Sequence, residues 1–225
     1  MSVPRPEAIL FDWDNTLVDG WAAIERGLND AFAAFGLPLW SRDEVLANVR
    51  MSLRDSFPRI FGPDWERARD IFYDGVRACH LEVLTPLPGT AAMLDRAGFV
   101  PLGVVSNKQG PLLRREAAHL GWAERFGAVI GAGDAEADKP SAAPILMALA
   151  AMRLPPSPSI WYVGDTAVDM QAARAAGCCA VLLGDAEHDG GVARCAPDVH
   201  LRDAEAMASL LLILDKSGKL PDSLG

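Results

Sequence analysis

A short apolar stretch near the amino terminus ends in acidic residues whose types and spacing could do chemistry. Residues 9–11 form an apolar run, Asp12 and Asp14 come next, and Thr16 follows at the same spacing. Because the interior of a sheet cannot hold unpaired carboxylates, a strand must end here and place both acids at its carboxyl end. Two neighbouring carboxylates need a shared proton or a cation, and Mg²⁺ with a phosphate group would supply the cation. Taken alone, the pattern also fits an acidic turn after an edge strand.

A hydroxyl group follows a second apolar run. Ser106 closes the run of residues 102–105 and precedes Asn107. At the carboxyl end of a strand, the serine hydroxyl could donate to a phosphoryl oxygen, and neighbouring backbone N–H groups would bind the same anion. The other interpretation is an N-cap of the helix expected from about Gly110. The two roles are compatible.

A lysine stands before the next helical pattern. Lys139 precedes Pro140, and we expect the proline in the first turn of a helix, where it would fix the lysine at the helix entrance. A cation there could neutralise both a phosphate and the carboxylates. The alternative is an ordinary solvated lysine.

A second acidic pair follows another apolar strand candidate, residues 160–163. Asp165 would face the same edge of the sheet as Asp12, and Asp169 would lie in the first turn of the next helix. An acid in that turn can complement the helix dipole. The dipole alone does not explain why Asp169 is paired with Asp165 after a hydrophobic strand, so we assign the pair to the same site.

The elements that must position these residues alternate along the chain. Strand candidates are residues 8–13, 102–106, 128–130, 160–163, 180–183 and 199–201. Helical patterns span residues 110–120, 142–152, 168–176 and 204–214. Near-continuous apolar strands that alternate with helices predict an α/β fold whose parallel sheet is covered on both faces. We therefore expect a doubly wound, Rossmann-like core.

One segment breaks this alternation. Between about Gly20 and Leu87 the apolar residues are spaced as in helices, and no convincing strand occurs. We expect an all-helical cap domain of residues 20–87, inserted into a core of residues 1–19 and 88–225 and lying over the strand ends as a lid. Ordinary covering helices are the alternative, but a succession of helices without a strand between them argues against it.

Length and charge narrow the function classes. The chain of 225 residues is 50% hydrophobic and carries a formal net charge of −9, with 30 acidic against 21 basic residues. This charge argues against a general nucleic-acid binder and against adhesion to anionic membranes. The sequence shows no signal-peptide pattern and no apolar segment of membrane length, so we expect a cytoplasmic protein. The cysteines and histidines lack zinc-site spacing, and we expect the cysteines to be reduced.

Together these features resemble the haloacid dehalogenase-like hydrolase superfamily. Four motifs carry the resemblance in chain order: Asp12-x-Asp14-x-Thr16, Ser106, Lys139 and Gly164-Asp165-x-x-x-Asp169. The match looks closest to the phosphoglycolate phosphatase-like branch, which shares Leu17-Val18-Asp19 and Pro88-Gly89. The resemblance covers nearly the whole chain, because the helical insert occurs where the family has its C1 cap.

The resemblance implies a Mg²⁺-dependent phosphatase that hydrolyses a small phosphorylated metabolite through an aspartyl-phosphate. Asp12 would be the nucleophile, and Asp14 would be the general acid and base. Thr16 would order the loop and assist the second step. Asn15 stands where this branch usually has glycine, but asparagine tolerates a left-handed backbone, so we expect the turn to survive.

The resemblance also implies a metal site and a phosphate site. Mg²⁺ would be held by the Asp12 carboxylate, the Asp14 backbone carbonyl and Asp165. Asp169 would be a further ligand or a support for the others. The residues expected to bind the transferring phosphoryl group are Ser106, Asn107 and Lys139.

The sequence leaves related activities open. A phosphosugar mutase resembling β-phosphoglucomutase shares every core residue and differs in a cap that binds a second phosphate. Arg50 and Arg54 in the expected cap could bind that phosphate, or could be solvated charges at a helix end. A 2-haloacid dehalogenase is disfavoured because Asp14 and Asp165 would repel other carboxylates without a metal. A non-catalytic binding module is weak because no motif position is missing. The phosphate ester is not specified, and a monomer and a homodimer are equally compatible.

Overall fold

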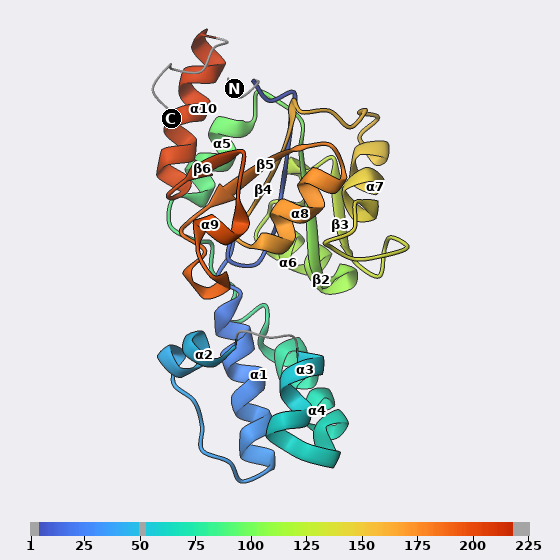
Figure 1. The fold of residues 1–225 in the computed structure, drawn as a ribbon, viewed down its shortest axis with the longest axis vertical. Coiled ribbons are helices and arrows are strands. Elements are labelled where there is room, and N and C mark those ends of the chain that lie inside the picture. The colour runs from blue at the N-terminus through green and yellow to red at the C-terminus, as the bar shows by residue number, and fades with distance from the viewer. Residues whose placement is uncertain (1–4, 50–52, 218–225) are drawn as a thin grey trace. The chain divides into compact units, whose positions relative to one another are not determined.

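The computed structural model describes residues 5–49 and 53–217, and the chain divides into two compact units (Figure 1). One unit combines Met1–Val18 with Pro86–Gly225, and the other is Asp19–Thr85. The expected insert of residues 20–87 starts one residue later and ends two residues later than this second unit.

Six parallel strands form the sheet of the first unit, which confirms the expected α/β class. In spatial order they are β3 (Ala128–Ala132), β2 (Leu102–Gln109), β1 (Ala8–Phe11), β4 (Ile160–Gly164), β5 (Cys179–Leu183) and β6 (Val199–Leu201). This is the doubly wound, Rossmann-like order, in which the direction of winding reverses between β1 and β4. Ligands of such sheets bind outside the carboxyl ends of the strands at this reversal. The end of β1 is therefore the place where the fold positions a site.

The strands match the expected ones closely, with differences of two or more residues at three carboxyl ends: β1 ends at Phe11, β2 at Gln109 and β3 at Ala132. β1 ends at Phe11, before Trp13, because the chain turns back on itself there: the Trp13 carbonyl accepts a hydrogen bond from the Leu17 N–H at 2.9 Å. β2 continues beyond the expected end at Ser106, and its pairing with β3 shifts register between Val105 and Gln109. This irregularity lies within the segment that carries the expected phosphate-binding residues.

Helices flank the sheet of the first unit (Figure 1). They are α5 (Thr90–Ala97), α6 (Gly110–His119), α7 (Ala143–Ala151), α8 (Ala167–Ala175), α9 (Val192–Cys195) and α10 (Ala204–Ser217), with short 3₁₀ turns at η2 (Ala123–Arg125) and η3 (Glu187–Asp189). Buried residues of α7 and α8 join Leu10 of β1 and Leu182 of β5 in one apolar cluster. The continuous burial of β1, β4 and β5 explains why these strands are apolar without alternation.

The regular elements in the described part of the second unit are helices joined by loops. It contains α1 (Trp21–Ala34), α2 (Arg42–Asn48), α3 (Leu53–Phe61), the 3₁₀ turn η1 (Gly62–Asp64) and α4 (Trp65–Cys79). Helices α1 and α4 pack closely at Gly27 and Gly75, where a Cβ on Gly75 would come within 3.2 Å of the Gly27 Cα. An aromatic core surrounds Phe32, Phe61 and Phe72. Arg50 and the side chain of Arg54 lie outside the described residues.

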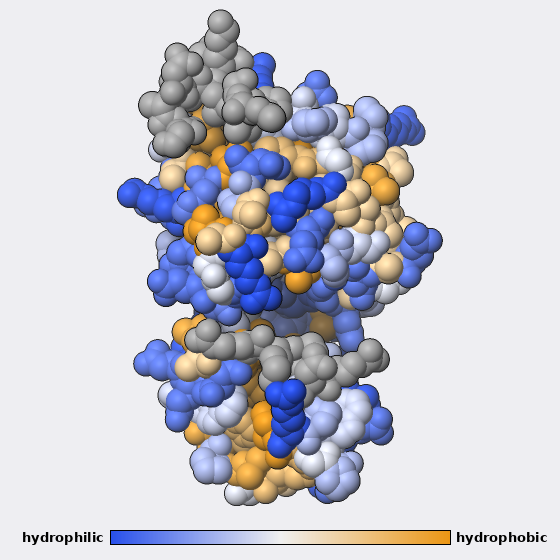
Figure 2. Space-filling view, viewed as in Figure 1, coloured by the Kyte–Doolittle hydropathy of each residue, from blue (hydrophilic) through white to orange (hydrophobic). Residues whose placement is uncertain are grey.

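Large apolar side chains are mostly buried in both units. Those that are more exposed are Leu37, Leu39, Ile60, Leu146, Met147 and Ile213. On the face shown in Figure 2, hydrophilic and apolar residues are interspersed. None of the helices in the described part of the chain is long and apolar enough to cross a membrane.

Candidate active site

The loop after β1 places the first acidic residues at the reversal point of the sheet. The Asp12 N–H donates to the Val163 carbonyl of β4 at 2.8 Å, which keeps Asp12 in line with the strand ends. The loop then turns sharply, and Asn15 has a φ angle of 61°. The expected left-handed conformation at Asn15 is therefore confirmed.

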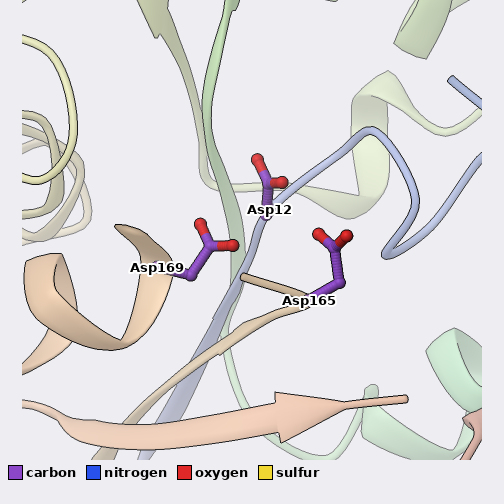
Figure 3. A group of neighbouring side chains, drawn as sticks. All are labelled: Asp12, Asp165 and Asp169. Atoms are coloured by element: carbon purple, nitrogen blue, oxygen red, sulfur yellow. The ribbon is translucent and has the colours of Figure 1, made fainter. Parts of the chain in front are cut away.

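Three carboxylates converge at this point. Asp12 extends from the end of β1, Asp165 follows β4, and Asp169 lies in the first turn of α8 (Figure 3). One oxygen from each carboxylate lies within 4.8 Å of the others, and all three residues are buried. Gly164 permits this approach, because a Cβ there would lie 2.4 Å from the Cβ of Asp169.

Lys139 lies inside this acidic cluster and is not a solvated lysine. Its Nζ donates to Asp12 Oδ1 and to Asp169 Oδ1, both at 2.7 Å, and to the Tyr162 hydroxyl at 3.0 Å. The tyrosine hydroxyl donates in turn to the Val105 carbonyl at 2.7 Å. The ammonium group is thus held in one position by three oxygens.

The backbone around Lys139 differs from the expected arrangement. Helix α7 begins at Ala143, so the expectation that Pro140 lies in the first turn was wrong, and Pro144 takes that position. Lys139 is instead held by the side chain of Asn107. The amide accepts from the Lys139 N–H and donates to the Lys139 carbonyl, each at 3.0 Å. The two hydrogen bonds hold the Lys139 backbone against the Asn107 side chain.

The two other expected phosphate ligands are placed near this edge of the sheet. Ser106 is buried in β2, and its Oγ accepts from the Lys108 N–H at 3.3 Å. Asn107 is committed through its side chain to Lys139, so any contact with phosphate would use its backbone. Contacts of Ser106 and Asn107 with phosphate remain predictions.

Asp14 lies outside the group of three carboxylates. Its Oδ1 accepts from Lys108 Nζ at 2.7 Å, and the same ammonium donates to Glu116 Oε2 at 2.7 Å. The Trp13 indole Nε1–H also donates to Glu116 Oε2 at 2.7 Å. Lys108 therefore holds the Asp14 carboxylate apart from the three converging carboxylates. The expected role of the Asp14 backbone carbonyl stays a prediction.

Thr16 and Asp169 have structural contacts as well as the expected place in the site. The Thr16 hydroxyl donates to Asp165 Oδ1 at 3.2 Å, which ties the loop after β1 to β4. Asp169 Oδ2 accepts from the Thr166 N–H at 3.0 Å and from its hydroxyl at 2.6 Å. Asp169 thus caps α8 and also contacts Lys139, so both interpretations of this residue hold.

Three residues of the site were not predicted, although two left a signal in the sequence. Lys108 comes two residues after Ser106, and residues at this spacing in a strand point to the same side. Glu116 lies three and four residues after Leu113 and Leu112, so it interrupts the apolar face of α6 with a charge. Tyr162 is a buried strand residue whose hydroxyl group has no sequence signature.

Burial and charge shift the acid–base properties of the site. Burial raises the pKa of Asp12 to about 7, Lys139 opposes this shift, and Asp169 and Asp165 add to it. Burial likewise raises the pKa of Asp165, against a lowering contribution from His188. Burial favours the neutral form of Lys139, but the Asp12 and Asp169 carboxylates outweigh burial. The pKa of Lys139 is therefore held well above its usual range. The cluster therefore has more negative charge than it can stabilise unaided.

The donor set of the cluster fits a divalent cation. Three carboxylates against one ammonium leave two negative charges when all are ionised and the His188 imidazole beside Asp165 is neutral. Asp165 Oδ2 is buried and lies 3.3 Å from His188 Nε2, yet it has no hydrogen bond of acceptable geometry within the described residues. Carboxylate oxygens are the ligands that Mg²⁺ prefers in proteins. The residues present thus fit Mg²⁺ in both charge and ligand type.

Comparison with known proteins identifies a family and agrees with the fold. The haloacid dehalogenase-like hydrolase family matches residues 9–183. A phosphoglycolate phosphatase of Chromobacterium violaceum is 30% identical over 195 residues, which cover 82% of this chain and 87% of that protein. An N-acetylmuramic acid 6-phosphate phosphatase of Pseudomonas aeruginosa is 30% identical over 185 residues, which cover 77% and 79%. A solved haloacid dehalogenase-like family hydrolase of Streptococcus pneumoniae has a TM-score of 0.78 at 22% identity, covering 91% and 97%.

The chain belongs to the haloacid dehalogenase-like hydrolase family. Within this family it is an enzyme of the phosphatase class, and it is similar to phosphoglycolate phosphatases.

Proposed function

We propose that this enzyme is a Mg²⁺-dependent phosphomonoester hydrolase that works through an aspartyl-phosphate. The observation that carries the proposal is the position of Asp12 at the end of β1, where Lys139 Nζ lies 2.7 Å from its carboxylate and two further carboxylates adjoin it. A buried carboxylate beside a cation and a candidate metal site is equipped to attack phosphorus.

Mg²⁺ would be held by the carboxylates of Asp12 and Asp165 and by the backbone carbonyl of Asp14. Asp169 would support the site, because its two oxygens already accept hydrogen bonds from Lys139 and Thr166. The bound ion would neutralise part of the charge on the phosphoryl oxygens and on the cluster.

Asp12 and Asp14 divide the chemistry between them. In the first step a bond forms between an Asp12 carboxylate oxygen and phosphorus, the ester P–O bond breaks, and Asp14 donates a proton to the leaving oxygen. In the second step Asp14 accepts a proton from the water that attacks phosphorus, the bond to Asp12 breaks, and inorganic phosphate leaves. Burial raises the pKa of Asp14, with partial opposition from Lys108, and this favours a protonated acid at the start.

The neighbouring residues position the phosphoryl group. The Lys139 ammonium supplies a fixed positive charge, the Ser106 hydroxyl supplies a donor, and the backbone at Asn107 supplies a further N–H. Their geometry requires no rearrangement of Lys139, because Asn107 and Tyr162 already fix its two ends. Thr16 keeps the loop after β1 attached to Asp165 throughout.

The substrate we propose is a small phosphorylated metabolite, with 2-phosphoglycolate as the first candidate. The two relatives above support the class, but their names give two different esters. We also propose that residues Asp19–Thr85 act as a cap that selects the substrate, with Arg50 and Arg54 as candidates for contact with its distal end. We further propose a cytoplasmic enzyme that is a monomer or a homodimer and needs no nucleic acid or membrane.

Phosphate release from 2-phosphoglycolate and from 4-nitrophenyl phosphate tests the proposal. We expect turnover with Mg²⁺, loss with EDTA, and recovery when Mg²⁺ is added back. An unchanged rate after chelation would contradict the proposed metal dependence. Conversion of a sugar phosphate to its isomer without release of phosphate would instead support the mutase alternative.

A further inference from the structure

A second network of polar residues lies beside the site and is not used by the steps above. Glu116 on α6 is fully buried, and its Oε2 accepts from the Trp13 indole N–H and from the Lys108 ammonium, each at 2.7 Å. The Lys108 side chain is 11% exposed, and it connects Glu116 to Asp14 Oδ1 at 2.7 Å. The network thus leads from the interior of α6 to the proposed general acid.

Burial of the Glu116 charge needs a reason. An isolated buried carboxylate costs several kcal/mol, and a pair that merely stabilises the fold can often be replaced by apolar residues without loss. Glu116 occupies a position of α6 between apolar neighbours such as Leu113 and Ala117, where an apolar side chain would pack readily. A carboxylate at this position is explained by what it does to Lys108.

Lys108 needs an anchor to define the position of Asp14. A lysine ammonium sits on a flexible four-carbon stem, and a single ion pair would leave it several orientations. Glu116 supplies a second fixed point, and Glu116 itself is fixed by Trp13. The Trp13 side chain is fully buried and packs edge-to-face on Trp122, with ring centroids 6.0 Å apart. Because Trp13 lies between Asp12 and Asp14 in the chain, the anchor acts on the catalytic loop itself.

We propose that Glu116 is a positioning residue that acts through Lys108 to hold the Asp14 carboxylate where it can protonate the leaving oxygen, with Trp13 fixing Glu116. The proposal rests on the proposed function, in which Asp14 is the general acid.

The test compares kcat/KM for an alkyl phosphate, 2-phosphoglycolate, with kcat/KM for 4-nitrophenyl phosphate. The value of kcat/KM for each substrate depends only on the steps up to and including the first phosphoryl transfer. Hydrolysis of the aspartyl-phosphate therefore does not affect it. Glu116→Gln should lower kcat/KM for the alkyl phosphate by about 10- to 100-fold, a part of what a general acid contributes. It should change the value for the aryl phosphate by less than about 3-fold, because that leaving group needs no proton.

A double-mutant cycle shows whether Glu116 acts through Lys108. Lys108→Met should show the same dependence on the leaving group, and the double variant should be no worse than Lys108→Met alone. The matched control is Arg114→Gln, which breaks the exposed pair with Asp134 on the same helix and should leave both substrates unaffected. If Glu116→Gln does not fold, Trp13→Phe removes the indole N–H donor but keeps an aromatic ring, and it should give a smaller loss with the same dependence on the leaving group.

Equal losses for both substrates, unchanged rates, or additive losses in the double variant would each overturn the role of Glu116. These outcomes differ from failure of the proposed function, in which the wild-type enzyme would release no phosphate from either substrate.

Discussion

Two lysines in this enzyme each bridge a pair of carboxylates, and the surroundings of the two bridges differ. Lys139 joins Asp12 to Asp169, and Lys108 joins Asp14 to Glu116, with all four contacts at 2.7 Å. At the Asp12 bridge a third carboxylate, that of Asp165, adjoins, so three carboxylates face one ammonium group, with the His188 imidazole beside Asp165. At the Asp14 bridge two negative charges face one, and a neutral indole N–H completes the set.

The different surroundings of the two lysines fit the different chemistry that we propose for Asp12 and Asp14. The excess of carboxylates around Asp12 suits a metal cation. That cation and the Lys139 ammonium would then attract the phosphoryl group. The more balanced charge around Asp14, whose side chain is 27% exposed, suits a group that gives and takes protons. Two acids two residues apart are thus held by different lysines, and this difference underlies the different roles we propose for them.

The largest expected effect is that of Asp12→Asn on turnover. The amide has nearly the same shape but is a poor nucleophile, so kcat should fall by about 10⁴-fold or more with every substrate. The fold should persist, since Lys139 keeps Asp169 as a partner. Steady-state assays and circular dichroism measure the two properties. Substantial turnover by a folded variant would remove Asp12 from the role of nucleophile.

Asp14→Asn should have the next largest effect, and that effect should depend on the leaving group. With 2-phosphoglycolate we expect a loss in kcat/KM of about 10²- to 10⁴-fold, because the amide cannot protonate the leaving oxygen. With 4-nitrophenyl phosphate the loss in kcat/KM should be much smaller. Equal losses with the two substrates would indicate that Asp14 acts only on the geometry of the metal site. The proposed difference in role between Asp12 and Asp14 would then be wrong.

Stability of the metal-free protein should report the strained charge around Asp12. Because the pKa of Asp12 is raised in the folded state, the native protein binds more protons than the unfolded chain between about pH 4 and about pH 7. This contribution to stability is present at low pH and is lost as the pH rises through that interval. The shift from 3.8 to about 7 corresponds to at most about 4 kcal/mol.

Denaturant unfolding of the wild type and of Asp12→Asn in EDTA measures this contribution. The asparagine variant should gain relative stability as the pH rises, and Mg²⁺ should restore the wild type. The control is Asp134→Asn: the Arg114 hydrogen bond lowers the pKa of Asp134, so its contribution to stability changes below about pH 4, and the difference between this variant and the wild type should be flat from about pH 4 to about pH 7. A difference between wild type and Asp12→Asn that is flat with pH would refute the shift.

The smallest effect is expected from the proposed cap. Replacement of both Arg50 and Arg54 by alanine should raise KM for an anionic metabolite by about 3- to 10-fold, or ~1 kcal/mol. A small aryl phosphate lacks the distal group and should be nearly unaffected. Lys139→Ala is the matched comparison, since it should impair all substrates alike. An arginine pair that affects both substrates equally, or neither, would leave specificity to other parts of the cap.

Much of this architecture follows from local patterns in the sequence. Continuous apolar runs predict the parallel strands, and the acids after β1 and β4 predict the cluster, because parallel strand ends share one edge. The position of the Asp14 carboxylate could not be derived in this way, since it depends on Lys108 and on a glutamate from α6. The expected place of Pro140 failed for a similar reason: Asn107, distant in sequence, fixes Lys139 without a helix.

The central claim is that Asp12 carries the phosphoryl group. Enzyme mixed with substrate and Mg²⁺, quenched in acid within the first turnovers and digested, can be analysed by mass spectrometry. We predict that the peptide containing Asp12 gains the mass of one phosphoryl group, and that Asp12→Asn shows no such gain. Rapid turnover with no phosphorylated peptide, or with the phosphoryl group on another residue, would contradict the account.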